Sequence, residues 1–202
     1  MIAHAASPDS RGDPGEDLRR LAQEPFVVLD TETTGLFAPE IVNIAVVDEE
    51  GRPLLHEYVR PAKPIEPEAE RLTGLSLASL EGKPSFPGIE PAVTAALGAR
   101  RVVIYNAAYD VAALENTYRR YGLEMPAFAP WCAMEWFARL YGQWDAGRRA
   151  YVWQPLHRAA AYFGVQVDSA HNALADARTT VRVMREALQR SGLRVEGMGS
   201  LF

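Results

Sequence analysis

The sequence predicts an α/β fold, a mixed five-stranded sheet flanked by helices on both faces. Three strand-like segments follow one another in the first third of the chain, as in an antiparallel meander. After residue 90, helical and strand-like segments alternate, which is typical of neighbouring strands joined by helices. The unbroken apolar run at residues 26–29 is that of a strand covered on both faces of the sheet.

The elements are expected in a simple order. Residues 1–16 are rich in Ala, Ser, Asp, Pro and Gly and lack periodicity, so we expect a disordered tail. One folded domain is expected over residues 17–192, followed by a short C-terminal tail at 193–202. Strands are expected at 26–30, 41–47, 54–59, 101–105 and 128–132, and helices at 16–23, 91–97, 107–121, 133–141, 153–163 and 173–190, with loops at 61–67 and 142–151.

The composition is that of a globular protein, with 48% hydrophobic and 23% charged residues among 202. No apolar run approaches the roughly 18 residues of a membrane span, so no membrane partner is expected. The first residues lack the order of a signal peptide, and Cys132, the single cysteine, cannot form an intramolecular disulfide. A cytoplasmic location is therefore expected.

A first polar cluster stands at the end of the first strand. Side chains two residues apart on a strand point to the same side, so Asp30 and Glu32 can approach one cation together. Thr33, Thr34 and Gly35 follow as a tight turn whose backbone amides are available to a ligand. A plain polar turn that closes a strand is the alternative reading, because short motifs often match by chance.

A second cluster lies where the fourth strand meets the helix expected at 107–121. Asn106 precedes this helix, where it fits an N-cap. Asp110 lies in the first turn among small apolar residues. A carboxylate there also gains from the helix dipole, so a purely structural role for Asp110 is the alternative.

The third cluster is the most discriminating. Asp176 stands near the start of the last helix, on the flank of the apolar stripe that faces the core. Burying an unpaired charge is costly, so this carboxylate needs a partner. His171, five residues earlier, is placed to reach the same point.

Four carboxylates gathered from distant parts of a chain repel one another unless cations hold them. Hydrolysis of a phosphodiester by paired Mg²⁺ or Mn²⁺ ions requires such a gathering, with a base to activate water. The sequence therefore predicts a metal-dependent nuclease. The net charge of −5 is only weak evidence against a nucleic-acid partner, because such a pocket contributes much of that excess itself.

The motifs DTETTG at 30–35, N-x-x-x-D at 106–110 and H-x-x-x-x-D at 171–176, in this order, resemble the three motifs of the DnaQ-like DEDDh 3′–5′ exonucleases. The resemblance spans about residues 26–188. It implies a ribonuclease-H-like fold and two divalent ions, Mg²⁺ or Mn²⁺. The implied ion ligands are Asp30, Glu32, Asp110 and Asp176, with Asp30 between the ions.

The resemblance also implies that His171 is the general base, a role that suits imidazole near neutral pH. The products would be 5′-mononucleotides released from a 3′ end. Thr33, Gly35 and Leu36 match positions that contact the terminal nucleotide, with Leu36 as an apolar wedge, and we count Asn106 with them as substrate-binding. Two departures concern neighbours of the ligands: Asn43 and Tyr105 stand where many relatives carry glutamate and histidine.

The expected substrate is the 3′ end of single-stranded DNA, as in proofreading or repair. Two alternatives are an exoribonuclease that trims RNA 3′ ends and a non-catalytic module that binds nucleic acid or a polymerase. A DNA polymerase is a candidate partner, and the sequence leaves the oligomeric state open. The segment 143–153 interleaves Arg148 and Arg149 with three aromatic residues, as single-strand binding requires, although core packing explains Trp153 better.

Overall fold

The computed structural model describes residues 12–98, 100–167 and 171–195. Most of the expected N-terminal tail and residues 196–202 of the expected C-terminal tail lie outside this part of the chain. Within it, no helix is both long enough and apolar enough to cross a membrane.

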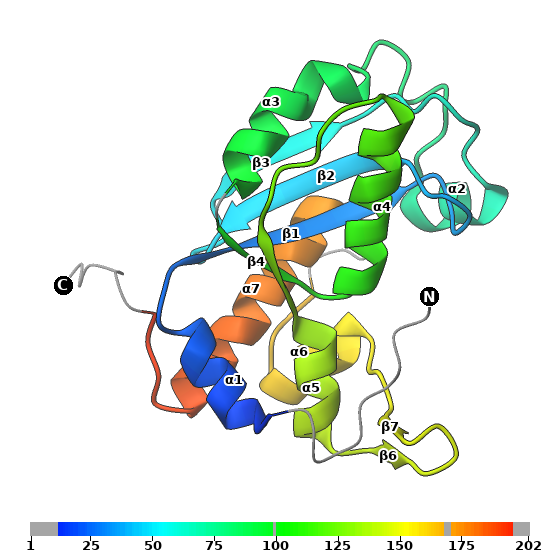
Figure 1. Cartoon of the computed structure of the whole chain (residues 1–202). Helices are drawn as coiled ribbons and strands as arrows, with labels where there is room; N and C mark the ends of the chain where they lie inside the picture. Colours follow the sequence, from blue (N-terminus) through cyan, green and yellow to red (C-terminus); the bar gives the residue numbers. More distant parts are fainter. Residues whose placement is uncertain (1–11, 99, 168–170, 196–202) are drawn as a thin grey trace.

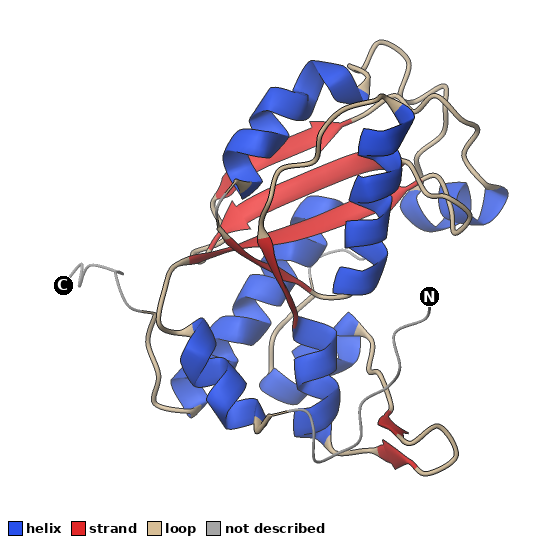
Figure 2. Ribbon diagram, viewed as in Figure 1, coloured by secondary structure: helices blue, strands red, loops and turns tan. Residues whose placement is uncertain are grey.

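The central element is a mixed five-stranded sheet, which confirms the predicted fold class (Figure 2). The strand order is β3-β2-β1-β4-β5. β1 pairs with β2, and β2 with β3, in antiparallel fashion, whereas β1–β4 and β4–β5 are parallel. The five strands are β1 Phe26–Thr33, β2 Ile41–Asp48, β3 Pro53–Tyr58, β4 Arg101–Ile104 and β5 Ala129–Cys132.

Helices cover both faces of the sheet (Figure 1). One apolar core lies between the sheet and α3 and α4, and it includes Val27 and Leu29 of β1. The other lies between the sheet and α1, α5, α6 and α7, and it includes Val28. This alternation along β1 is the period of two that a strand requires. The helices are α1 Pro14–Leu21, α2 Pro67–Thr73, α3 Phe86–Leu97, α4 Ala107–Arg120, α5 Ala133–Tyr141, α6 Leu156–Phe163 and α7 Ala173–Arg190.

Several boundaries differ from the expected ones for local reasons. α1 begins at Pro14, within the range assigned to the tail, because Asp13 caps it by accepting a hydrogen bond from the Glu16 amide. α3 begins five residues before the predicted start, so that Pro91 lies inside the helix. α6 begins only at Leu156, since Pro155 disfavours helical geometry for the residue before it.

One helix and one pair of short strands were not predicted. α2 buries none of its residues, so it carries no apolar periodicity that would reveal it. The segment expected as a loop at 142–151 contains an antiparallel pair, β6 Trp144–Asp145 and β7 Ala150–Tyr151.

β4 is shorter than β1, and this difference in length leaves part of β1 without a neighbouring strand. β4 pairs only with residues Phe26 to Leu29 of β1 and ends at Ile104 opposite Leu29. The second half of β1, from Asp30 onwards, therefore has one edge free of strand pairing, and α4 begins beside it.

Candidate active site

Three carboxylates from β1 and α7 converge at this free edge. Asp30 and Glu32 lie on the face of β1 that α7 covers, and Asp176 lies in the first turn of α7. One carboxylate oxygen from each of the three lies within 4.8 Å of the others. Among the described residues, this is the group of acidic, histidine and cysteine side chains that is close enough to share a metal ion.

Asp110 reaches the site from α4. Its side chain accepts a hydrogen bond from a β1 amide that no neighbouring strand pairs with. Its Oδ1 accepts hydrogen bonds from the backbone amide of Thr31 at 3.0 Å and from the Thr31 hydroxyl at 2.7 Å. In a longer parallel sheet, a carbonyl of β4 would bind that amide. Asp110 is buried, and these bonds hold its carboxylate close enough to Asp30 and Glu32 to raise the pKa of both.

The electrostatics of the four carboxylates are unfavourable in the absence of a cation. Burial, followed by repulsion from Asp110, Glu32 and Asp176, raises the pKa of Asp30 well above its usual value. Burial and the neighbouring carboxylates raise the pKa of Glu32 from 4.5 to about 8. Burial raises the pKa of Asp110 to about 7 even though its bonds to Thr31 oppose the shift, and burial also raises the pKa of Asp176.

His171 lies two residues before α7, and its backbone rather than its ring touches the cluster. Its amide donates a hydrogen bond of 3.0 Å to Asp176 Oδ2. The residue has a φ of 60°, a left-handed conformation that histidine adopts more readily than most residues. The residue is exposed, and its side chain is close enough to Asp176 to oppose the rise in the pKa of that carboxyl group.

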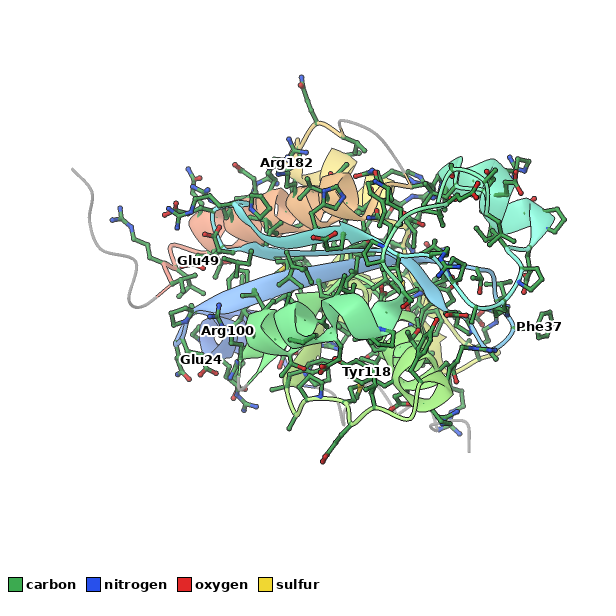
Figure 3. The ribbon with its side chains drawn as sticks, turned by 90° about the horizontal axis from the view of Figure 1, so that it is seen from above. Glu24, Phe37, Glu49, Arg100, Tyr118 and Arg182 are labelled. Carbon is green, nitrogen blue, oxygen red and sulfur yellow. The ribbon has the colours of Figure 1, made fainter. Side chains whose placement is uncertain are left out.

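The turn after β1 presents an apolar surface beside the carboxylates. Leu36 is 76% exposed and Phe37 81% exposed, and Phe37 projects from the edge of the molecule (Figure 3). Thr33, in contrast, is buried, and its hydroxyl bonds to the Gly35 carbonyl and to the hydroxyl of Tyr109. The side chain of Thr33 therefore stabilises the turn. Of the two side chains expected to contact the terminal nucleotide, Thr33 and Leu36, only that of Leu36 is exposed.

Glu66 fixes this turn from outside, a contact that the sequence did not reveal. Its carboxylate accepts hydrogen bonds from the amides of Leu36 at 3.2 Å and Phe37 at 3.5 Å, and its own amide donates to the Thr34 carbonyl at 2.8 Å. A Cβ on Gly35, whose φ is 143°, would lie 2.0 Å from the Glu66 carboxyl carbon. Only glycine therefore fits beneath this carboxylate.

Asn106 and Asn43 have different roles from those their positions suggested. Asn106 occupies the N-cap position of α4, but its side chain makes no capping hydrogen bond, so the expected capping role of that side chain is wrong. Asn43, fully buried on β2, accepts a hydrogen bond from the Ala173 amide at 3.1 Å and donates one to the Glu57 carbonyl at 2.9 Å. It thereby fixes the start of α7, which carries Asp176.

The donor set fits divalent cations of the hard type. Carboxylate oxygens are the ligands that Mg²⁺ and Mn²⁺ prefer, and the raised pKa values of the four carboxyl groups indicate that the site favours added positive charge.

Comparison with known proteins identifies the family. The RNase T family model, described as "Exonuclease", matches residues 27–184. The uncharacterized exonuclease CP81 of Escherichia phage 186 is 36% identical over 183 residues, which cover 86% of this chain and 93% of the phage protein. The DNA polymerase III epsilon subunit of Escherichia coli K12 is 27% identical over 117 residues, 52% of this chain and 48% of that subunit.

The solved structures agree with this result. Exonuclease X, in complex with 5′ overhanging duplex DNA, has a TM-score of 0.64 and 25% identity over 86% of this chain and 96% of its own. Escherichia coli exonuclease I, in complex with single-stranded DNA, has a TM-score of 0.68 over 83% of this chain and 41% of its own, and at 17% identity it supports the fold. The chain belongs to the DnaQ-like family of 3′–5′ exonucleases.

Proposed function

We propose that this enzyme hydrolyses single-stranded DNA from the 3′ end and releases 5′-mononucleotides. The observation that carries the proposal is the convergence of Asp30, Glu32, Asp110 and Asp176 at the free edge of β1, with pKa values raised by burial and mutual repulsion. The preference for DNA is supported by exonuclease X, which was solved with DNA and is one quarter identical to this chain.

The four carboxylates would hold two divalent cations, Mg²⁺ or Mn²⁺. When bound, such ions lower the pKa of water and stabilise negative charge on the leaving oxygen. Thr31 contributes by orienting Asp110, and Asn43 by fixing the helix that carries Asp176. Ligands held by such outer contacts keep their geometry when substrate arrives.

His171 is the proposed general base, because it is exposed and its amide bonds to Asp176, and because a neutral imidazole can accept a proton from water. A ring nitrogen would accept a proton from the attacking water as the water oxygen bonds to phosphorus and the bond from phosphorus to the 3′-oxygen breaks. The leaving 3′-oxygen would take a proton from solvent. Leu36, exposed at the rim, would pack against the terminal base and leave the scissile phosphate over the carboxylates.

The decisive assay uses 5′-labelled single-stranded DNA and RNA of equal sequence, each with Mg²⁺, with Mn²⁺ and with EDTA. We expect a ladder of DNA products that shortens from the 3′ end and disappears with EDTA. Asp176→Asn should abolish it. Glu186→Gln, a carboxylate further along the same helix and outside the cluster, is the matched control and should cut like the wild type.

The RNA arm tests the alternative substrate. Faster shortening of RNA than of DNA would assign the enzyme to RNA 3′-end trimming.

The role of His171 is tested separately. His171→Ala should reduce kcat by about a hundredfold or more, the usual contribution of a general base, with little change in KM. An unaltered kcat would contradict that role.

A further inference from the structure

The β6–β7 hairpin, residues 143–153, is exposed, and contacts within it fix its conformation. Trp144 packs edge-to-face against Tyr151 across the two strands, with ring centroids 5.2 Å apart. At the tip, Asp145 Oδ1 accepts hydrogen bonds from the amides of Gly147 at 2.9 Å and Arg148 at 3.0 Å. Beyond the second strand, Trp153 is 61% exposed. Core packing, the alternative reading of Trp153, is therefore wrong.

The base of the hairpin is tied to the active-site side of the molecule. Gln154 is buried, and its side-chain nitrogen donates hydrogen bonds to the Val152 carbonyl at 2.9 Å and to Gln143 Oε1 at 3.2 Å, which closes the hairpin. Its carbonyl accepts a hydrogen bond of 2.8 Å from the hydroxyl of Tyr105. Tyr105 directly precedes Asn106, whose carbonyl accepts from the Asp110 amide.

This attachment links the base of the hairpin to the segment between β4 and α4. In Figure 1, β6 and β7 lie below the start of α4, on the right-hand side where β1 also ends. The exposed Phe37 lies on the same right-hand side in the view from above (Figure 3). The Leu36–Phe37 turn, which receives the terminal nucleotide under the proposed function, and the hairpin thus lie toward the same side of the molecule, with the start of α4 between them in Figure 1.

The hairpin carries a net positive charge in a chain whose net charge is negative, because residues 143–153 contain Arg148 and Arg149 but only one acidic residue, Asp145. The chain as a whole carries −5, and the carboxylate cluster repels a polyanion, yet Arg148 and Arg149 stand side by side at the hairpin tip. Arg148 pairs loosely with Asp145, at 3.6 Å. Arg149 is exposed and, within the described residues, makes no ion pair with an acidic side chain. Arginine beside exposed aromatic rings matches what a single strand presents, phosphates and unstacked bases.

We propose that the β6–β7 hairpin is a second substrate-binding site, which holds the single-stranded segment upstream of the 3′-terminal nucleotide through base stacking on Trp153 and phosphate contact with Arg149. The inference rests on the proposed function. It predicts that the enzyme distinguishes long substrates from substrates with a single nucleotide, because only a long strand reaches the hairpin.

The test compares two substrates in the full-length enzyme with Mg²⁺. One is a long single-stranded oligodeoxynucleotide, and the other is the p-nitrophenyl ester of thymidine 5′-monophosphate, which has no upstream nucleotide. Trp153→Ala should lower kcat/KM for the oligonucleotide by about tenfold, the size of one lost base–aromatic stack. The rate on the ester should stay at the wild-type value.

Arg149→Gly removes the charge without harming the hairpin. Arg149 has a φ of 50°, a conformation that favours glycine, so this variant should fold at least as well as the wild type. It should weaken oligonucleotide binding and reduce the slope of log KM against log salt by about 0.7, the value for one phosphate contact on a single strand. The matched controls are Tyr162→Ala, an exposed aromatic on α6, and Arg119→Gln, at the far end of α4, and both should behave like the wild type.

The outcomes separate this inference from the proposed function. If the wild type hydrolyses neither substrate, the proposed function fails and this inference with it. If the wild type hydrolyses both and the hairpin variants match it on the oligonucleotide, the second site alone is refuted. It is also refuted if Trp153→Ala slows both substrates equally, or if it converts a dimer into a monomer without changing oligonucleotide hydrolysis, since the hairpin would then be a contact between copies.

Discussion

Thr31 lies between two metal-ligand candidates in the sequence and holds a third in space. Its hydroxyl and amide both donate to Asp110. Thr31→Val keeps the shape and the amide but removes the hydroxyl. We expect kcat/KM to fall by about 10- to 100-fold, as for other residues that orient metal ligands, with a stability loss of only about 1 kcal/mol.

Steady-state kinetics and urea unfolding measure these two effects. Thr94→Val is the control, because the hydroxyl of Thr94 bonds to Glu90 on α3. An equal loss of activity in both variants would show that the effect of Thr31 is not specific to the site.

Glu32 connects protonation to stability. Its pKa is raised from 4.5 to about 8 in the metal-free protein, so the folded state binds the proton more tightly than the unfolded chain does. The stabilisation from that proton is complete below about pH 4.5 and is lost as the pH rises through about 8. We therefore expect the free energy of unfolding in EDTA to fall between pH 5 and pH 8.

The Glu32→Gln variant isolates this contribution. It should lose less stability than the wild type over the same pH interval, and added Mg²⁺ should remove most of the wild-type loss because bound cations stabilise the charged carboxylates. Urea unfolding at several pH values gives the measurement. Parallel curves for the two proteins would contradict the assignment.

Among single residues, the sequence revealed the carboxylates that stand beside apolar segments. Asp30, Glu32, Asp110 and Asp176 were predicted from three polar clusters next to apolar segments and from the family resemblance that these clusters carry, and the structure brings all four together. Thr31 and Glu66 were not predicted as contacts. A hydrogen bond between residues 79 positions apart leaves no trace in local pattern or periodicity.

Among the elements, α7 depends on β2 for its exact start. Asn43 bonds to the Ala173 amide and to the Glu57 carbonyl from a fully buried position. Asn43→Ala leaves both groups without a partner, so we expect a loss of about 2 kcal/mol in the free energy of unfolding and a fall in kcat from displacement of Asp176. Asn116→Ala, on the partly exposed face of α4, is the control. Unchanged stability in Asn43→Ala would refute the anchoring role.

The Leu36–Phe37 turn depends on Glu66. Glu66→Ala frees both amides, so the apolar pair should lose its fixed position while the carboxylates keep theirs. We expect KM for single-stranded DNA to rise by about tenfold, comparable to one hydrogen bond to a charged group, with kcat nearly unchanged. Glu66→Gln, which keeps one acceptor, should restore part of the affinity, and Glu70→Ala on the exposed α2 should have no effect. A fall in kcat alone would point to another role.

Element boundaries were predictable where capping and periodicity agree. α7 was predicted at residues 173–190, because an apolar stripe runs between Asn172, whose side chain caps the helix by accepting from the Ala175 amide, and the stop at Ser191. α3 was misplaced because Pro91 resembles a first-turn proline, although Pro87 occupies that position. The hairpin was missed because two-residue strands are too short for alternation to be visible.

For the molecule as a whole, the order of elements predicted the sheet better than any one segment did. A meander followed by strand–helix alternation leads to antiparallel pairs on one side of β1 and parallel pairs on the other. What the order could not show is that β4 stops opposite Leu29. That difference in length opens the edge of β1, and the position of the site follows from it.

The extent of the folded unit can be tested at the N-terminus. Leu18 and Leu21 of α1 are buried in the core beside α5, and the Trp136 indole donates a hydrogen bond of 3.0 Å to the Pro14 carbonyl. A chain that starts at Glu24 loses these contacts, whereas a chain that starts at Gly12 keeps them. Because each buried leucine contributes about 1.5–3 kcal/mol, the shorter chain should be less stable by about 3–6 kcal/mol.

Urea unfolding, followed by tryptophan fluorescence, compares the two chains, and the emission of the shorter one should shift to the red as Trp136 meets water. Asp13→Ala in the longer chain is a graded control, because it removes only the N-cap of α1 and should cost about 1 kcal/mol. Since α1 packs on α5, on the face of the sheet opposite α3 and α4, its loss should reduce stability before it reduces turnover of the protein that remains folded. Equal urea midpoints for the two chains would place α1 outside the folded unit.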